Sequence, residues 1–199
     1  MVKLANEDIK TREVLDWKGL HVFHFPFSSC SQKLRIFLAL KGVDWESHLI
    51  DLMGNENLQE YFLGINPRGL LPVLVHDGDV HIESNDILTY LESVYPEPRL
   101  IPEGSANEVA ALLKHEHELP LDLRALSFRF VFNPPHAPKS AEDLEVYANT
   151  GAGTANGQTA GRGARETAVC GTSAGRGTQV EDARVQDAEP RGVVVRVVD

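Results

Sequence analysis

The apolar positions of the first hundred residues form short runs separated by turn-forming residues, a pattern typical of a small α/β domain. Residues 20–25 favour β-structure and are followed by Pro26, which predicts a short buried strand. The next apolar positions recur at helical spacing. They predict a largely buried helix over residues 29–41, with Gly42 as its C-cap.

The pattern continues through the rest of this region. The further elements predicted are a strand at 45–50, a short helix at 55–63 closed by Gly64, strands at 73–76 and 80–82 around Asp77-Gly78-Asp79, and a helix capped by Ser84 and ended by Tyr95-Pro96. Two strands joined through a helix are expected to be parallel, whereas the Asp-Gly hairpin is antiparallel. The order βαβ-α-ββα predicts an α/β, thioredoxin-like domain over residues 18–97.

A second region, over residues 105–148, is predicted to be all-α. A Pro-rich linker precedes it, and residues 108–132 have a helical pattern of leucines and valines. Pro120 interrupts this pattern, so we expect a kink or a break there. Residues 141–147 are compatible with one more short helix.

The composition changes abruptly at the end of the chain. From residue 151 to residue 199 there is no Leu, Ile, Met, Phe, Tyr, Trp or Lys. Such a segment cannot bury enough apolar surface to offset its chain entropy, so residues 149–199 are predicted to be a disordered tail. Its bias toward Gly, Ala, Arg and Thr is what translation of a shifted, GC-rich frame would give, which we state as a hypothesis.

Charge and cysteine content restrict the classes of partner. The net charge of −10 belongs entirely to residues 1–150, because six acidic and six basic residues cancel beyond them. An acidic body argues against non-specific nucleic-acid binding.

Cys30 and Cys170 do not make a disulfide framework, which favours a reduced, cytoplasmic setting. The sequence has neither a signal-peptide pattern nor an apolar run that could span a membrane.

Two residues at the start of the first helix are candidate catalytic groups. Ser28 is placed to stabilise a bound thiolate, because its hydroxyl lies beside a helix N-terminus that favours negative charge. The alternative is an ordinary serine N-cap. Cys30 falls in the first helical turn, where thiol pKa values are lowered, and it could form a mixed disulfide. Its alternative is a small, partly buried apolar residue.

Two further segments are candidate binding elements. Leu71-Pro72 enters a strand after a glycine, so a cis peptide bond is plausible there. In a thioredoxin-like domain this turn leaves the N–H and C=O of Leu71 free to pair with an extended peptide; the alternative is a strand-edge proline. Glu83 can accept from an ammonium group, and Ser84 with nearby N–H groups can bind a carboxylate. Together they suit an amino-acid head group such as a γ-glutamyl end, with helix capping as the alternative.

Residues 20–100 resemble the N-terminal domain of a cytosolic glutathione transferase. Ser28-Ser29-Cys30-Ser31, followed by Leu34-Arg35-Ile36 and by residues 38–42, is similar to the zeta-class signature, and bacterial β-etherase-like transferases are also similar. Gln32-Lys33 departs from the aromatic-Arg pair usual there. The resemblance implies glutathione as co-substrate, Ser28 as the thiolate-activating residue with Cys30 close by, Leu71 and Pro72 at the backbone-pairing and cis-proline positions, and Glu83 and Ser84 in the γ-glutamyl site.

The resemblance also implies an all-helical C-terminal domain of five or more helices, of which this chain is predicted to hold only part. Glutathione, a small electrophile and a second copy of the chain in a homodimer are the implied partners. We expect attack of a glutathione thiolate on an electrophile by conjugation, isomerisation or ether cleavage. The alternatives are a non-catalytic binding or interaction module and a Cys30-dependent thiol transferase. No metal is expected, including at His115, Glu116 and His117.

Overall fold

A computed structural model describes residues 2–116, 154–155 and 158–159 of the chain. Its main feature is a five-stranded sheet in the order β1-β5-β4-β2-β3. The strands are β1 (Val2–Lys3), β2 (Leu20–His24), β3 (Glu46–Leu49), β4 (Val73–His76) and β5 (Asp79–Ile82). β2 and β3 are parallel, and the other three neighbouring pairs are antiparallel. The predicted parallel pair and the predicted hairpin are both confirmed.

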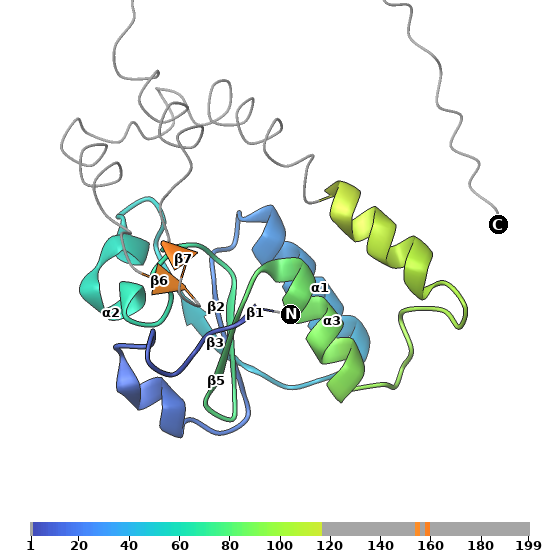
Figure 1. Cartoon of the computed structure of the whole chain (residues 1–199), viewed down its shortest axis with the longest axis horizontal. Coiled ribbons are helices and arrows are strands. Elements are labelled where there is room, and N and C mark those ends of the chain that lie inside the picture. Colours follow the sequence, from blue (N-terminus) through green and yellow to red (C-terminus); the bar gives the residue numbers. More distant parts are fainter. Residues whose placement is uncertain (1, 117–153, 156–157, 160–199) are drawn as a thin grey trace, which may run out of the picture.

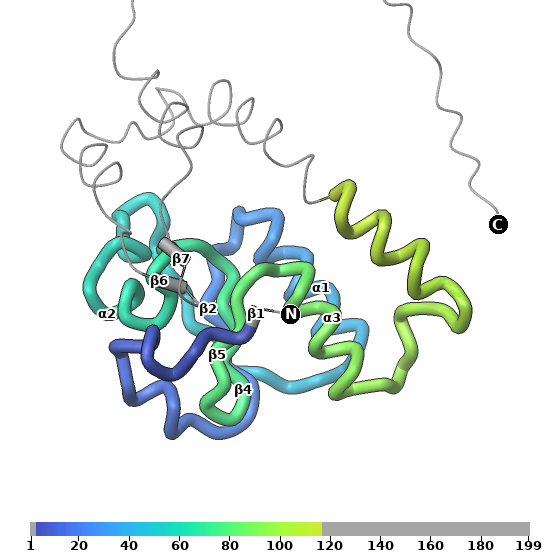
Figure 2. The backbone as a smooth tube through the Cα atoms, viewed as in Figure 1, coloured from blue at the N-terminus to red at the C-terminus, as the bar shows by residue number. Residues whose placement is uncertain are grey.

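The helices lie on the two faces of this sheet. α1 (Ser29–Lys41) and α3 (Ser84–Val94) lie side by side on one face, whereas α2 (Glu60–Leu63) lies on the other (Figure 1). The 3-10 helices η1 (Arg12–Asp16) and η2 (Glu56–Leu58) lie on the same side as α2, away from α1 and α3 (Figure 2). The element order is that of the predicted thioredoxin-like domain, which is confirmed.

Alternation along the strands builds a separate core on each face. Val22 of β2 and Leu74 of β4 pack with leucines and isoleucines of α1 and α3. Phe23 and Val73, one position along each strand, pack instead with residues of η1 and α2. Because successive side chains of a strand point to opposite faces, one short strand contributes to both cores.

The helix predicted over residues 55–63 is not continuous. The structure divides it into η2 and α2, because Gln59 between them has an extended backbone with φ −76° and ψ 153°. Asn55, before η2, is left-handed with φ 59°. The backbone N–H groups here bond locally, as in the 2.9 Å bond from Leu58 N–H to the Asn55 carbonyl. The segment is therefore two short turns.

The N-terminal residues belong to the sheet, which the sequence did not predict. In β1, Val2 pairs with Ile82 of β5, and Lys3 pairs with His81. Figure 2 traces the dark-blue segment that leads from this strand past β5. The sheet thus includes residues that precede residue 18.

Part of the second region is also described. Residues 106–116 are helical, as predicted from the leucine and valine pattern, and the rest of the predicted 108–132 helix and the 141–147 helix lie outside the described residues. Within the segment predicted as a tail, β6 (Thr154–Ala155) and β7 (Gln158–Thr159) form an antiparallel pair. No helix in the described part of the chain is both long and apolar enough to cross a membrane.

Candidate functional site

Sheet topology brings the three predicted segments to one edge. β5 is antiparallel to β4, and β4 is antiparallel to β2, so β2 and β5 run in the same direction. α1 follows β2 and α3 follows β5, so both helices begin at the carboxyl ends of these two strands. β4 runs the other way and begins at the same edge, directly after Leu71-Pro72. Two helix N-termini therefore flank a proline turn.

Ser28 is the N-cap of α1. Its backbone is extended, with φ −74° and ψ 120°, and its Oγ accepts a hydrogen bond of 3.3 Å from the Ser31 N–H. The capping interpretation is confirmed. A hydroxyl oxygen that accepts one bond keeps its own proton for donation. Capping is therefore compatible with donation to a thiolate, which stays a prediction.

Cys30 lies half-buried in the first turn of α1 as a free thiol. The loop before the helix is held from two sides. Gln32 Nε2 donates to the Pro26 carbonyl at 2.9 Å, and the Phe25 N–H donates to Ser31 Oγ at 3.4 Å. These bonds hold the loop that carries Ser28 against the first turn of α1.

Leu71 and Pro72 are joined by a cis peptide bond, as the sequence suggested. Pro72 is buried and Leu71 half-buried against the core. The preceding turn is braced by Asn66 Nδ2, which donates to the Leu70 carbonyl at 2.9 Å. Among the backbone hydrogen bonds between described residues, none uses the N–H or the C=O of Leu71. Among the described residues, both groups therefore lack a backbone partner, as the predicted pairing with an extended ligand requires.

Glu83, not Ser84, is the N-cap of α3, which corrects the prediction. Ser84 is the first helical residue, and Glu83 has a left-handed φ of 67°. The Glu83 side chain makes no capping bond. Instead its Oε1 accepts from Nη1 of Arg68, and both side chains are partly exposed. A positive φ turns the chain between β5 and α3, and leaves the carboxylate facing the loop before β4.

Arg68 is a residue that sequence reasoning missed. It lies three residues before Leu71-Pro72, the turn that the sequence singled out, but its charge received no role. The structure pairs it with Glu83, beside the first N–H groups of α3. A carboxylate, a guanidinium and a helix N-terminus thus lie together. A zwitterionic amino-acid head group is complementary to this set, because a carboxylate has lone pairs for two donors.

A polar network connects the site to the helix at residues 106–116. Lys33 Nζ of α1 donates to Oδ1 of Asn85 in the first turn of α3, and to Oε2 of Glu116 at 2.9 Å. Asn85 Nδ2 donates to the Leu113 carbonyl at 2.9 Å and to Glu116 Oε2 at 3.0 Å. The helix at 106–116 is therefore bound directly to the residue after Ser84.

A separate pocket of about 450 Å³ lies against the end of β3 and the turns of η2 and α2. Its described lining includes Phe23, His48 and Phe62 and none of the six predicted site residues. It belongs to the other face of the sheet. The edge that carries Ser28, Leu71 and Glu83 is built from two helix ends and a turn.

Residues 27–94 match the family model described as glutathione S-transferase, N-terminal domain. The chain contains a glutathione S-transferase N-terminal domain. It is 43% identical to glutathione S-transferase 1 of Dianthus caryophyllus over 84 residues, which cover 42% of this chain and 38% of that one. It is 44% identical to the maleylacetoacetate isomerase of Mus musculus over 78 residues, which cover 38% and 36%. The chain thus spans less than two-fifths of the length of these curated relatives.

Solved structures support the same assignment of the fold. The glutathione S-transferase domain is similar to a β-etherase of Sphingobium sp. strain SYK-6, with a TM-score of 0.55, 28% identity, and coverage of 65% of this chain and 56% of that one. It is also similar to human glutathione S-transferase T1-1 in its apo form, with a TM-score of 0.55, 25% identity, and coverage of 64% and 58%. The predicted resemblance to zeta-class and β-etherase-like transferases is confirmed for this domain.

Proposed function

We propose that this chain binds glutathione at the edge where α1, α3 and the Leu71-Pro72 turn meet, and activates its thiol for attack on an electrophile. The observation that carries the proposal is the meeting of these three segments within a glutathione S-transferase N-terminal domain. The family model matches only residues 27–94, so the proposed activity is argued from the geometry of this edge.

Binding uses the free backbone and the paired charges. The N–H and C=O of Leu71 pair with the cysteinyl backbone of glutathione, in the manner of an added strand. The γ-glutamyl ammonium is bound by the Glu83 carboxylate. The γ-glutamyl carboxylate is bound by Ser84, the first N–H groups of α3 and Arg68, since helix N-termini favour anions. Each charge of the γ-glutamyl end thereby meets an opposite charge.

Activation of the thiol falls to Ser28. A free thiol has a pKa near 8.5 and is mostly protonated at neutral pH. Donation from the Ser28 hydroxyl, together with the N-terminal dipole of α1, lowers this pKa. A shift of one to two units needs about 1.4 to 2.7 kcal/mol, which a charge-assisted hydrogen bond and the dipole supply together.

The thiolate then forms a carbon–sulfur bond with the electrophile. In conjugation the product keeps glutathione. In isomerisation the thiolate adds to a conjugated cis double bond, the former double bond rotates, and elimination returns the thiolate. In ether cleavage an aryl alkoxide or phenolate leaves. Relatives named as maleylacetoacetate isomerases and a neighbour named as a β-etherase support the last two.

A turnover assay with glutathione and a generic aryl electrophile tests this proposal. We expect Ser28→Ala to lose at least about tenfold in rate at neutral pH, because each unit of thiol pKa reduces the thiolate fraction about tenfold. Cys30→Ser is the matched control and should retain activity. Equal rates for wild type and Ser28→Ala would contradict a role for Ser28.

Two alternatives are separated by adding a glutathione-binding assay and a deglutathionylation assay. A non-catalytic binding or interaction module would bind glutathione without turnover. A thiol transferase would lose deglutathionylation activity in Cys30→Ser and keep it in Ser28→Ala, since Cys30 also lies in the first turn of α1. A cytoplasmic setting and a homodimer stay predictions, which fractionation and light scattering would test.

A further inference from the structure

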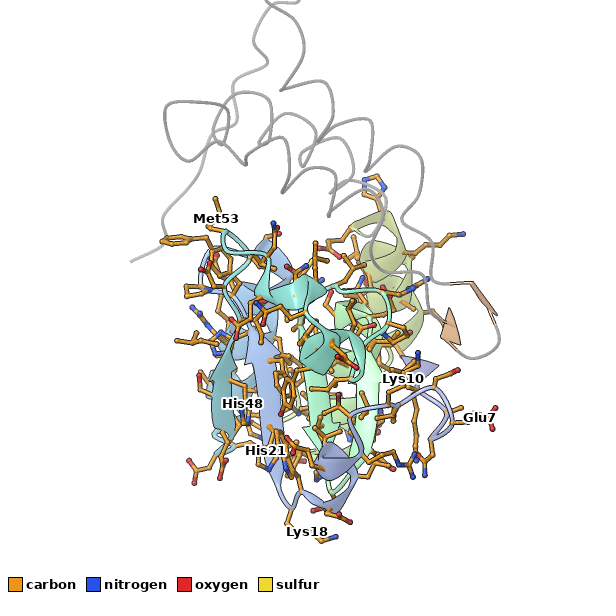
Figure 3. All side chains as sticks on the ribbon, turned by 90° about the vertical axis from the view of Figure 1, so that its left-hand side faces the viewer. Glu7, Lys10, Lys18, His21, His48 and Met53 are labelled. Carbon is orange, nitrogen blue, oxygen red and sulfur yellow. The ribbon has the colours of Figure 1, made fainter. Side chains whose placement is uncertain are left out.

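A second cluster of reactive side chains lies at the opposite edge of the sheet. His21 begins the register of β2 with β3, where it pairs with Glu46, and Phe23 pairs with His48. Residues 21 and 23 point to the same face of β2, as 46 and 48 do on β3. Figure 3 shows His21 and His48 close together on these neighbouring strands. His21, Glu46 and His48 therefore share one face of two parallel strands, with His21 and Glu46 near the amino ends.

The distances within this cluster match those between the ligands of one small cation. His21 Nδ1 lies 3.1 Å from His48 Nε2 and 3.3 Å from Glu46 Oε2. All three ligand atoms lie within 4.8 Å of one another. In a tetrahedral zinc site with bonds of about 2.0 to 2.2 Å, neighbouring ligand atoms are about 3.3 to 3.6 Å apart. Two of the three separations are thus already close to those values.

The backbone sets the correct tautomer of His21. Its Nε2 lies 2.9 Å from the Lys18 carbonyl oxygen, which can only accept, so Nε2 carries the proton. Nδ1 of the neutral ring then presents its lone pair to the cluster. A backbone carbonyl bound to the distal ring nitrogen is the usual outer partner of a metal-binding histidine.

Aromatic rings hold both imidazoles in place. Trp17 stacks on His48 with ring centroids 4.8 Å apart, and lies 4.6 Å from the His21 ring. Phe23 stacks on His48 at 4.7 Å. His21 is buried, whereas the Glu46 side chain is 74% exposed and free to reorient. The site therefore has two fixed nitrogen ligands and one adjustable oxygen ligand open to water.

We propose that His21, Glu46 and His48 form a site for a divalent transition-metal cation such as Zn²⁺, with water completing a tetrahedron. Two imidazoles and one carboxylate form a ligand set that zinc favours. The site lies at the edge opposite Ser28 and Leu71, so the metal acts on structure: it joins β3 to β2. The sequence alone predicted no metal, because Glu46 and His48 lie 25 and 27 positions after His21. Only the register of β2 with β3 brings the three residues together.

Calorimetric titration of the chelator-treated full chain with ZnCl₂ tests the site, with far-UV circular dichroism to confirm that each variant is folded. We expect one Zn²⁺ per chain. His48→Gln should weaken binding by at least about tenfold, because even outer-shell partners of metal ligands contribute about 10- to 100-fold. Glu46→Gln should also weaken it and, being exposed, should leave the fold intact.

The control separates this cluster from the two histidines of the second region, His115 and His117. His115→Gln/His117→Gln removes two histidines that lie close to each other in the sequence and should leave zinc affinity unchanged. Glu60→Gln controls for the loss of a surface carboxylate. Loss of zinc binding in the double variant alone would overturn the proposal. The proposal would also be overturned if Glu46→Gln and His48→Gln each bound zinc with the affinity of the wild type. Absence of zinc binding by the wild type would overturn it as well.

Discussion

Arg68 and Glu83 form an ion pair that joins the loop before β4 to the N-cap of α3. Glu83 reaches this position through a backbone φ of 67°. The two charges neutralise each other before any ligand binds, and each remains partly exposed. The pair therefore offers a carboxylate and a guanidinium already held side by side to a ligand that has both charges.

Glu83→Gln should weaken glutathione binding about tenfold, since a hydrogen bond to a charged group contributes about 1.5 to 3 kcal/mol. The loss also leaves Arg68 without its partner, so ligand ammonium and Arg68 repel. Isothermal titration with glutathione measures the effect, and Glu97→Gln, at an exposed position, is the control. Unchanged affinity in Glu83→Gln would remove Glu83 from the site.

Lys33→Met should loosen the helix at residues 106–116. Lys33 supplies the cation that Asn85 and Glu116 share, so its removal breaks the ion pair that joins Glu116 of this helix to α1. Hydrogen exchange of the backbone amides of residues 106–116 should accelerate. Lys114→Met, at an exposed position of the same helix, should not change exchange in this way. Equal exchange in both variants would contradict the role of Lys33.

Lys41 and Glu92 form a buried pair at the other end of α1 and α3. Lys41 Nζ lies 2.6 Å from Glu92 Oε2 and donates to the carbonyls of Tyr95 and Pro98 at 2.7 and 2.8 Å. Burial opposes ionisation of Glu92, but hydrogen bonds from Lys41 and from backbone N–H groups outweigh it and lower its pKa.

Lys41→Met should cost about 3 to 5 kcal/mol of unfolding free energy, because it leaves a buried carboxylate without its cationic partner. Lys41→Met/Glu92→Leu should recover much of this loss, since it removes both charges. Urea unfolding of the two variants and of Lys114→Met measures the difference. A single variant within about 0.5 kcal/mol of wild type, as for a surface change, would refute a structural role for the pair.

His81 makes the stability of the domain depend on pH. It is buried under Tyr90 with ring centroids 4.0 Å apart, and neither ring nitrogen has a hydrogen-bond partner among the described residues. Burial lowers its pKa from 6.5 to about 4, against the opposing effect of Asp79. Between these values the unfolded chain binds a proton that the folded chain does not.

The unfolding free energy should therefore fall as the pH falls from about 6.5 to about 4, by about 3 kcal/mol from His81. His81→Phe keeps the stacked ring and removes the titration, so its stability should decline less over this range. Chemical unfolding at several pH values compares the two proteins. Parallel pH profiles would show that His81 does not contribute.

Local chemistry made much of the fold predictable. The run from Leu20, the Gly42 C-cap with φ 63° and the Asp77-Gly78 turn each carry their own signature, and each lies where predicted. β1 has only two residues, so no periodicity marks it. The break at Gln59 also has no local signal, because glutamine is a good helix former and only its extended backbone ends η2.

The sequence predicted which segments form the site, but it did not predict the contacts between their side chains. Ser28 and Leu71 lie in segments whose turn and cap residues identify them. The pairing of Arg68 with Glu83 depends on strand order and on one positive φ, neither of which a linear pattern carries. Ser84 was assigned the cap because serine favours that position, but the turn after β5 places Glu83 there instead.

Thermal unfolding of the full chain and of the variant Glu83→Ala/Ser84→Ala, each with and without millimolar glutathione, tests whether glutathione binds at this edge. A ligand at about 100 times its dissociation constant adds roughly 2.7 kcal/mol to the unfolding free energy. We expect a clear rise in Tm for the wild type that the double variant lacks. A cooperative transition with the same Tm in the presence and absence of glutathione would contradict it.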